Sequence, residues 1–249
     1  MVERQVPKIE YFDSLDSTNQ KLKEMLQDPS LPEFTVVYAD YQTAGRGQPG
    51  NTWESEKGKN LTFSILIKPD FIDVGEQFAI TQLVTLAILD VLRPHCKIVS
   101  VKWPNDIYAG DQKLAGILIE NSLKGSYIYN SVIGIGLNLN QKTFSAKLPN
   151  AVSLSKLTGK EHDVKKTLKL FIKAFANRYI AFAENPDFRK LSADYVEHLY
   201  RNKGSHLYKD QNGSFEAEFH EIKPTGQLVL KRSDGSLHSY SFKEVEFII

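Results

Sequence analysis

The amino-acid sequence predicts an α+β protein, in which a larger region of strands and helices is followed by a small β-barrel. Before Tyr200, apolar runs with strand-like alternation are interspersed with long amphipathic stretches of helical period. After it, short strand-like runs are separated by turns at Gly213, Gly226 and Gly235, and this regular spacing is typical of a barrel. We therefore predict two domains, spanning 1–200 and 201–249.

The elements follow from hydrophobic period and from turn residues. Strands of the larger domain are expected at 9–15, 34–39, 61–67, 99–102, 107–109, 113–120 and 127–137. Helices are expected at 16–27, 74–92, 164–183 and 188–200, and Pro94 ends the second of them. Strands of the barrel are expected at 206–209, 215–222, 227–231, 237–242 and 245–248.

The first helix begins at a polar group that has two compatible roles. Ser17 and Gln20 have the spacing of a capping box, so Ser17 can simply cap the helix. A helix N-terminus also attracts anions, so the same serine can contact a ligand.

A glycine-rich loop, GRGQPGNTW at 45–53, connects two of the expected strands. Its glycines match the G-x-G-x-x-G pattern, but a strand-like run with Thr62 and Ser64 on its polar face follows instead of a helix. The dinucleotide-binding interpretation is therefore rejected. Arg46 and exposed backbone amides suit a carboxylate or a phosphate, and Trp53 offers a flat face to a ring. We interpret the loop as the cover of an anionic ligand.

Composition excludes several classes of protein. The chain has 249 residues, 31 Lys+Arg and 30 Asp+Glu, and this near-neutral balance does not indicate a nucleic-acid partner. Its single cysteine, Cys96, excludes an internal disulfide framework. No secretory signal and no apolar run long enough to cross a membrane is found in the sequence, so we expect a cytoplasmic protein.

Four motifs, taken together and in this order, resemble those of the biotin protein ligases. They are Ser17-Thr18-Asn19, YQTAGRG at 41–47, KWPND at 102–106 with KLAGILIE at 113–120, and GIGLNLN at 134–140. A GRG triplet alone would be weak evidence, but the whole set, spread over essentially the whole chain, is specific. Because the first strand is expected at about Ile9, the resemblance is to the short form without an N-terminal DNA-binding domain.

The resemblance implies a ligase that uses ATP and biotin as substrates, with Mg²⁺. Biotin and ATP would give biotinyl-5'-AMP and pyrophosphate, and biotin would then pass to a specific lysine of the biotin carboxyl carrier protein domain of a carboxylase. It also implies a mixed sheet flanked by helices, followed by an SH3-like barrel. The expected assembly is a monomer or a homodimer.

The same resemblance assigns residues by position. Biotin would be bound by Ser17, Thr18, Asn19, Gln42, Gly45, Arg46, Gly47, Gln48, Lys113, Gly116 and Gly134. ATP would be bound by Arg46, Trp53, Asn105, Lys113 and Asn138. Lys113 and Arg46 would be the catalytic residues, and Asp106 would hold the metal ion.

Physical chemistry agrees with these roles. Attack of a carboxylate on an α-phosphate brings two anions together, so positioning and charge neutralisation lower the barrier most. Lys113, Arg46 and Mg²⁺ can supply the positive charge, and Lys102 could add to it, although a lysine at a strand end is more often solvated. Asp106 has three open roles: it orients a lysine, holds Mg²⁺ or forms an Asx-turn.

The loop departs from the family at Gln48 and Asn51, where basic residues are common. Lys57 or Lys59, on the same segment, could compensate. Two alternative functions remain open at this point. One is a lipoate ligase or octanoyl transferase, which also acylates a carrier lysine. The other is a sensor that binds biotinyl-AMP and regulates transcription without catalysis.

Overall fold

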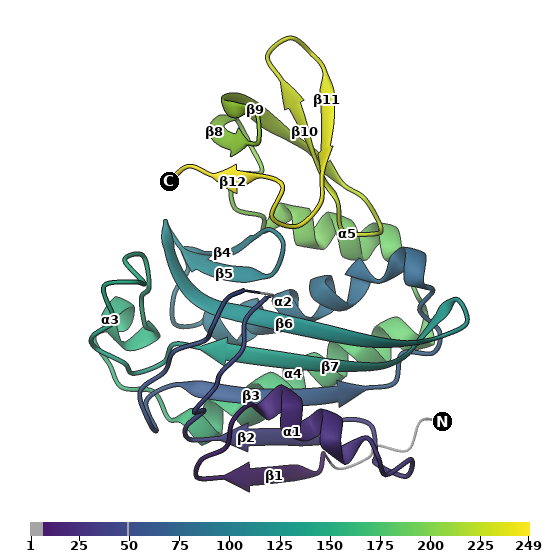
Figure 1. Cartoon of the computed structure of the whole chain (residues 1–249), viewed down its shortest axis with the longest axis vertical. Coiled ribbons are helices and arrows are strands. Elements are labelled where there is room, and N and C mark those ends of the chain that lie inside the picture. The colour runs from purple at the N-terminus through teal and green to yellow at the C-terminus, as the bar shows by residue number, and fades with distance from the viewer. Residues whose placement is uncertain (1–6, 49) are drawn as a thin grey trace.

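The strands expected in the larger region form one seven-stranded sheet in a computed structural model that describes residues 7–48 and 50–249 (Figure 1). The order is β1 (Ile9–Phe12), β2 (Val36–Ala39), β3 (Leu61–Ile67), β7 (Tyr127–Leu137), β6 (Gln112–Lys124), β5 (Asp106–Ala109) and β4 (Val99–Lys102). Strands β1 and β2 are parallel and every other neighbouring pair is antiparallel, so the sheet is mixed.

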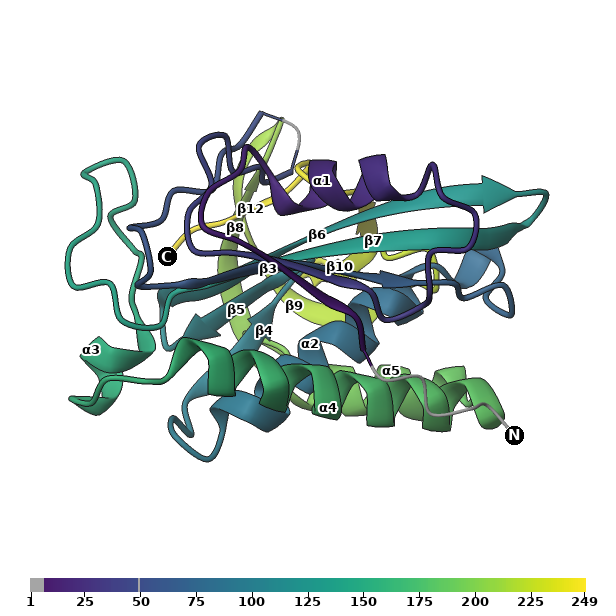
Figure 2. The same cartoon turned by 90° about the horizontal axis from the view of Figure 1, so that it is seen from below.

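Helices cover both faces of this sheet. Figure 2 shows α1 (Thr18–Met25) on one face, and α2 (Phe78–Leu92), α4 (Val164–Glu184) and α5 (Phe188–Glu197) on the other. Several elements differ from the predictions. Strand β2 begins at Val36, β6 runs on to Lys124, and α1 and α5 are shorter than expected. Strand β1 is shorter than expected, the helix predicted at 74–92 opens with a separate 3₁₀ turn (Val74–Glu76), and a short helix α3 (Leu154–Thr158) was not predicted.

Helix α2 is the central core helix. The segment Val74–Leu92 is long and apolar enough to cross a membrane by length and composition, yet 72% of its most apolar window is buried inside the protein. Its apolar side chains pack on the sheet and on α4 and α5, and this packing explains why a helix of a folded core is apolar on nearly all sides.

The sequence of strand β3 alternates between apolar and polar residues, which predicts one exposed face. In the structure all seven of its residues are buried. Phe63 and Ile65 belong to the main core, as their apolar character predicts. Thr62 and Ser64 point to the opposite face, where α1 covers them. A buried polar side chain requires a hydrogen-bond partner, so this face of the sheet holds a polar interior beneath α1.

The C-terminal strands form a second, five-stranded antiparallel sheet, consistent with the small barrel that the sequence predicts. Its order is β11 (Leu237–Tyr240), β10 (Leu228–Arg232), β9 (Gly213–Ile222), β8 (Ser205–Asp210) and β12 (Glu246–Phe247). Its inward side chains belong to the same contiguous apolar cluster as those of α2. The division of the chain after residue 200 stays a prediction.

Trp103 and Gly226 make contacts that hold the barrel against the larger region. The Trp103 indole N–H donates to the Gly226 carbonyl at 2.8 Å, and its ring packs edge-on against Phe242, with centroids 5.4 Å apart. Gly226 has φ +96°, and a Cβ there would lie 2.7 Å from the Phe78 ring, so only glycine lets the barrel sit this close to α2. These contacts bring the turn at 241–245 up to the larger sheet.

Candidate functional site

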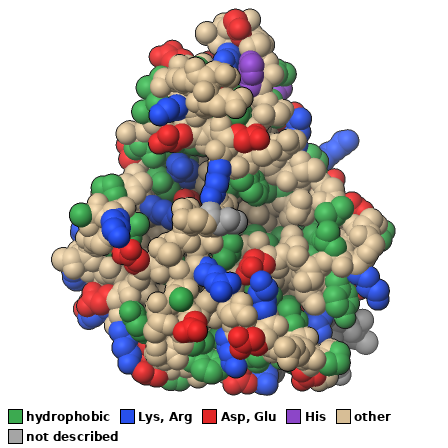
Figure 3. All heavy atoms as spheres, viewed as in Figure 1, with side chains coloured by type: hydrophobic (Ala, Val, Ile, Leu, Met, Phe, Trp, Pro, Cys, Tyr) green, Lys and Arg blue, Asp and Glu red, His purple; other side chains and the backbone are tan. Residues whose placement is uncertain are grey.

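A cavity of about 790 Å³ opens between the larger sheet and the barrel, and the four sequence motifs converge on it. Its floor is the glycine-rich middle of β6 and β7, and the loop at 45–53 covers one side. The face shown in Figure 3 is hollowed below the barrel, with Lys and Arg side chains along the rim.

The loop at 45–53 closes on itself as a small hairpin. The Gly47 N–H donates to the Asn51 carbonyl at 3.0 Å, and the Trp53 N–H donates to the Gly45 carbonyl at 2.9 Å. A Cβ on Gly45 would lie 2.4 Å from the Trp53 carbonyl oxygen, so the hairpin needs glycine at its base. The glycine content of the motif is therefore explained by this close approach.

Trp53 lies across the glycines of the cavity floor. A Cβ on Gly136 would lie 2.2 Å from the indole ring, and one on Gly116 would lie 3.2 Å from it. The indole N–H is buried and has no hydrogen-bond partner among the described residues. An aromatic face with a spare donor, next to open cavity, suits a flat polar ring.

At one end of the cavity, the α1 N-terminus joins a buried network of polar side chains. Ser17 caps the helix, as its capping-box spacing predicts. The backbone N–H of Thr18 donates to Gln42 Oε1 at 2.8 Å, and the Ser64 hydroxyl donates to Asn19 Oδ1 at 2.5 Å. A Cβ on Gly134 would lie 2.1 Å from Asn19 Oδ1, so glycine is required for this contact. The network presents fixed donors and acceptors to a small polar ligand.

Glu120 anchors the same network from β6. It accepts a hydrogen bond from Asn19 Nδ2 at 2.8 Å and pairs with Lys23 at 2.8 Å. Burial alone would raise the pKa of Glu120, but hydrogen bonds from Lys23 and Asn19 hold it below its usual value. Asn19 therefore faces a carboxylate, which fixes the orientation of its amide.

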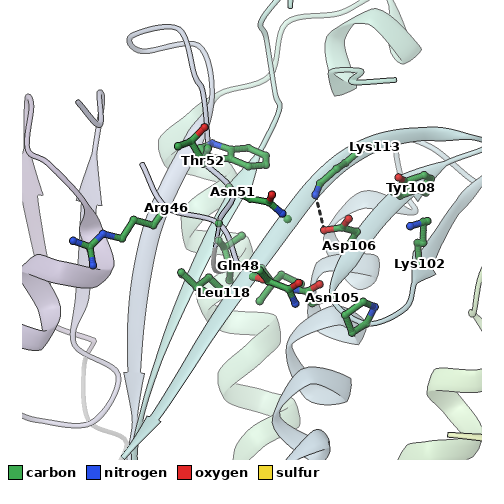
Figure 4. Close-up of a pocket in the computed structure, with 18 of the residues that line it drawn as sticks. Arg46, Gln48, Asn51, Thr52, Lys102, Asn105, Asp106, Tyr108, Lys113 and Leu118 are labelled. Carbon is green, nitrogen blue, oxygen red and sulfur yellow. Dashed lines mark hydrogen bonds and ion pairs between the residues drawn. The ribbon is translucent and has the colours of Figure 1, made fainter. Parts of the chain in front are cut away.

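The opposite end of the cavity is the charged end. Lys113 Nζ lies 2.7 Å from Asp106 Oδ1, and both side chains remain partly exposed to the cavity (Figure 4). The Asn105 amide donates to the Ile117 carbonyl, which ties the KWPND turn to β6. Asp106 therefore orients a lysine in this structure, which is one of the three roles considered for it.

Lys102 is a second lysine at this end, in a less polar setting. Its Nζ lies 5.2 Å from the centre of the Tyr108 ring and 4.6 Å from that of Phe247. Burial lowers the pKa of Lys102, and the Asp106 carboxylate counteracts that effect in part. Lys102 is therefore partly covered by Phe247 of β12 and is not fully solvated, although it still lines the cavity.

The structure brings most of the predicted site residues together. Those that line the cavity are Ser17, Thr18, Asn19, Gln42, Arg46, Gly47, Gln48, Trp53, Asn105, Asp106, Lys113, Gly116 and Gly134. Two predicted residues do not line it. Gly45 is buried at the base of the hairpin, and Asn138 is buried behind the floor, where its backbone pairs with Leu114 and Leu154.

Arg46 lines the cavity but does not point at its charged end. Figure 4 shows its guanidinium directed away from Lys113 and Asp106, toward α1. Its side chain is exposed, and its charge lowers the pKa of Glu120. In this conformation Arg46 therefore belongs to the α1 side of the cavity.

Sequence reasoning missed two groups of residues. Ser64 was assigned to a polar strand face, although a serine within an apolar strand before the site is itself a signal of a buried polar network. The barrel also supplies part of the wall, and no motif indicated this. The residues it contributes are Lys243, Val245, Glu246, Phe247, Ile248 and Ile249.

Comparison with known proteins gives a consistent result. The family model described as "Biotin/lipoate A/B protein ligase family" matches residues 11–138. The bifunctional ligase/repressor BirA of Bacillus subtilis is 31% identical over 237 residues, which cover 93% of this chain and 71% of that protein. The biotin–[acetyl-CoA-carboxylase] ligase of Paracoccus denitrificans is 30% identical over 230 residues, which cover 88% of this chain and 92% of that protein.

Solved structures share the fold. A biotin protein ligase from Aquifex aeolicus, in complex with biotin and ATP, superposes with a TM-score of 0.79 at 24% identity and covers 97% of this chain and 98% of its own. A ligase from Leishmania major, in complex with biotinyl-5-AMP, gives 0.65 at 21% identity, with 95% and 99% covered. Both match the arrangement of the larger sheet followed by the barrel.

Proposed function

Since this chain belongs to the biotin/lipoate A/B protein ligase family, and within it to the biotin protein ligases, we propose that it attaches biotin to a carrier protein in two steps. In the first, biotin and ATP form biotinyl-5'-AMP and release pyrophosphate. In the second, a lysine of a biotin carboxyl carrier protein domain takes the biotinyl group. The observation that carries the proposal is the convergence of the four motifs on one cavity.

Biotin would lie at the α1 end of the cavity. The network of Thr18, Asn19 and Gln42 supplies fixed polar partners for a ureido ring, which has both donors and acceptors. Gly134 lets Asn19 approach β7, and Gly116 lets the Trp53 ring lie over β6, so these glycines place two side chains that border the site. The biotin carboxylate then extends toward Lys113.

ATP would lie across the charged end, with its base near Trp53. In the first step, a carboxylate oxygen of biotin attacks the α-phosphorus as the bond to pyrophosphate breaks. Lys113 neutralises the negative charge that gathers there, and Asp106 holds its ammonium group in place. In the second step, the carrier lysine attacks the carbonyl carbon, AMP leaves, and the amine loses a proton.

Mg²⁺ fits this site in its usual manner, bound largely through substrate phosphates. Among the described residues, no group of three or more acidic, cysteine or histidine side chains could form a metal cage. Of the described carboxylates on the cavity wall, Asp106 and Glu246, we assign the ion to Asp106 because it lies beside Lys113 at the charged end. Bound there, the ion would neutralise phosphate charge.

The direct test is to weigh a carrier. The protein is incubated with biotin, ATP, Mg²⁺ and a biotin carrier domain, and the carrier is then examined by mass spectrometry. A gain equal to biotin less one water supports the proposal. Parallel incubations contain lipoate or octanoate in place of biotin. A gain from one of these acids and none from biotin would favour the sibling activity, and no gain with tight binding of biotinyl-AMP would favour the sensor. We expect the reaction in the cytoplasm, with no nucleic-acid or membrane partner, by a monomer or homodimer.

Ligand binding should change the fluorescence of Trp53. The chain has two tryptophans. Trp103 also lines the cavity, but it is buried and its indole is hydrogen-bonded to the barrel. We therefore expect ATP with biotin to shift or quench the emission of the wild type, and to change that of Trp53→Phe much less. A full response in Trp53→Phe would contradict this position of the nucleotide.

Replacing Gln48 should change how tightly the intermediate is held. Gln48 lines the cavity next to Asn105, and its neutral amide cannot neutralise a phosphate. Charge-assisted hydrogen bonds are roughly twice as strong as neutral ones, so Gln48→Arg should slow the escape of biotinyl-AMP. The measurement is a chase without carrier. An unchanged escape rate would show that position 48 does not face the phosphate.

A further inference from the structure

The loop at 45–53 supplies little positive charge for a triphosphate. Gln48 and Asn51 are neutral, and Arg46 points toward α1. Lys57 pairs with Asp13 at 2.7 Å, and neither Lys57 nor Lys59 lines the cavity. In this structure, therefore, neither Lys57 nor Lys59 compensates for the missing positive charge at Gln48 and Asn51.

The barrel brings a lysine to the same place. Lys243 lines the main cavity, and it also lines a smaller one of about 350 Å³ next to Gln48 and Asn105. Its Nζ lies 3.8 Å from where a Cβ on Gly50 would be, so its ammonium group reaches the loop from the barrel side. Among the described residues, it is one of four cationic residues that line the cavity, with Arg46, Lys102 and Lys113.

The turn that carries Lys243 is held firmly. Glu244 accepts a hydrogen bond from the Ser241 backbone at 2.6 Å and donates its own N–H to the Ser241 carbonyl at 3.1 Å. Phe242, the preceding residue, packs on Trp103 of the KWPND motif. The backbone of Lys243 is thus positioned by the same contact that docks the barrel, and its exposed side chain extends from that turn along the cavity wall.

We propose that Lys243 binds the triphosphate of ATP from the barrel side and so provides the charge that Gln48 and Asn51 lack. Lys113 and Asp106 meet the α-phosphate from the sheet, where the bond forms, while Lys243 meets the triphosphate between the loop and the barrel, where Gln48 also lies. Glu246, a barrel carboxylate on the same cavity wall, opposes the lowering of the pKa of Lys102 by burial. The inference deepens the proposed function and rests on it.

The test variant is chosen to keep the backbone intact. Lys243 has φ +71°, a left-handed conformation that asparagine tolerates better than alanine. Lys243→Asn therefore removes the charge with little strain. Lys231→Asn is the matched control, because Lys231 is an exposed lysine on β10 that does not line the cavity.

Two measurements are made on the full chain. The first is the affinity for inorganic tripolyphosphate by calorimetry, which requires neither biotin nor chemistry. The second is the KM for ATP in biotin-dependent pyrophosphate exchange. We expect Lys243→Asn to weaken both roughly tenfold or more, the scale of one lost charge-assisted contact, while biotin affinity and the Lys231→Asn control stay unchanged. Lys243→Arg should retain most of the affinity.

The outcomes separate the two proposals. Normal tripolyphosphate affinity in Lys243→Asn, or an equal loss in Lys231→Asn, overturns the role of Lys243. Adding Gln48→Arg to Lys243→Asn should restore tripolyphosphate affinity, and a double variant no tighter than Lys243→Asn overturns the idea that the two positions share one group. A wild type that binds tripolyphosphate but never exchanges pyrophosphate would count against the proposed ligase reaction and not against this phosphate site.

Discussion

Lys113→Ala should lower the rate of biotin-dependent pyrophosphate exchange by roughly 10²-fold or more, while biotin affinity falls much less. In the proposed reaction, negative charge is greatest in the adenylation transition state, and Lys113 lies at the charged end of the cavity, 2.7 Å from Asp106. The substitution also leaves Asp106 without its partner, facing the phosphate. The variant therefore loses the positive charge of Lys113 and also leaves the negative charge of Asp106 unpaired.

Lys124→Ala is the control for this experiment, because Lys124 is an exposed lysine near the far end of the same strand. Its exchange rate should match the wild type. Near-normal exchange in Lys113→Ala would remove this lysine from the catalytic role.

Gly136→Ala should weaken ATP binding by roughly 10- to 100-fold, the scale of losing one aromatic anchor. The added Cβ would lie 2.2 Å from the Trp53 ring. The strand cannot move away, because Gly136 is paired with Thr62 on one side and Gly116 on the other. The indole must therefore leave its place over the floor.

The Gly136→Ala experiment has an internal check. In a Trp53→Ala background the clash no longer exists, so the same substitution should have little further effect on ATP affinity. Ser131→Ala on the same strand removes a buried hydroxyl that has no hydrogen-bond partner among the described residues, and it should bind ATP normally. Full additivity of Gly136→Ala and Trp53→Ala would show that the ring is not the cause.

Most of the fold could be predicted from the sequence because its elements have clear periods. The predicted order of strands and helices agrees with the structure except at α3. The five residues of α3 are too few for a helical period to be seen. The face of β3 could not be predicted. Thr62 and Ser64 look solvent-exposed by alternation, and only the packing of α1 over that face makes them buried.

The site could be located from local motifs, but not completed from them. Glycines at 116 and 134, and the pair of Lys113 with Asp106, are close in space because β5, β6 and β7 are neighbours. Asn138 was placed on the nucleotide side by its motif, although it follows the last residue of β7 and lies behind the floor. Lys243 is distant in sequence from every motif, so only the docking of the barrel reveals it.

The shared wall between barrel and sheet has a consequence for control of the enzyme. A ligand that contacts both parts strengthens the joint between them, and by thermodynamic reciprocity anything that strains the joint loosens the ligand by the same free energy. The carbonyl of Gly226 and the ring of Phe242 lie at this joint. Changes at these two groups should therefore alter nucleotide affinity, although they are remote from the reacting atoms. In the proposed reaction, a carrier protein that displaced the barrel as it docked would thereby change the rate at which AMP is released.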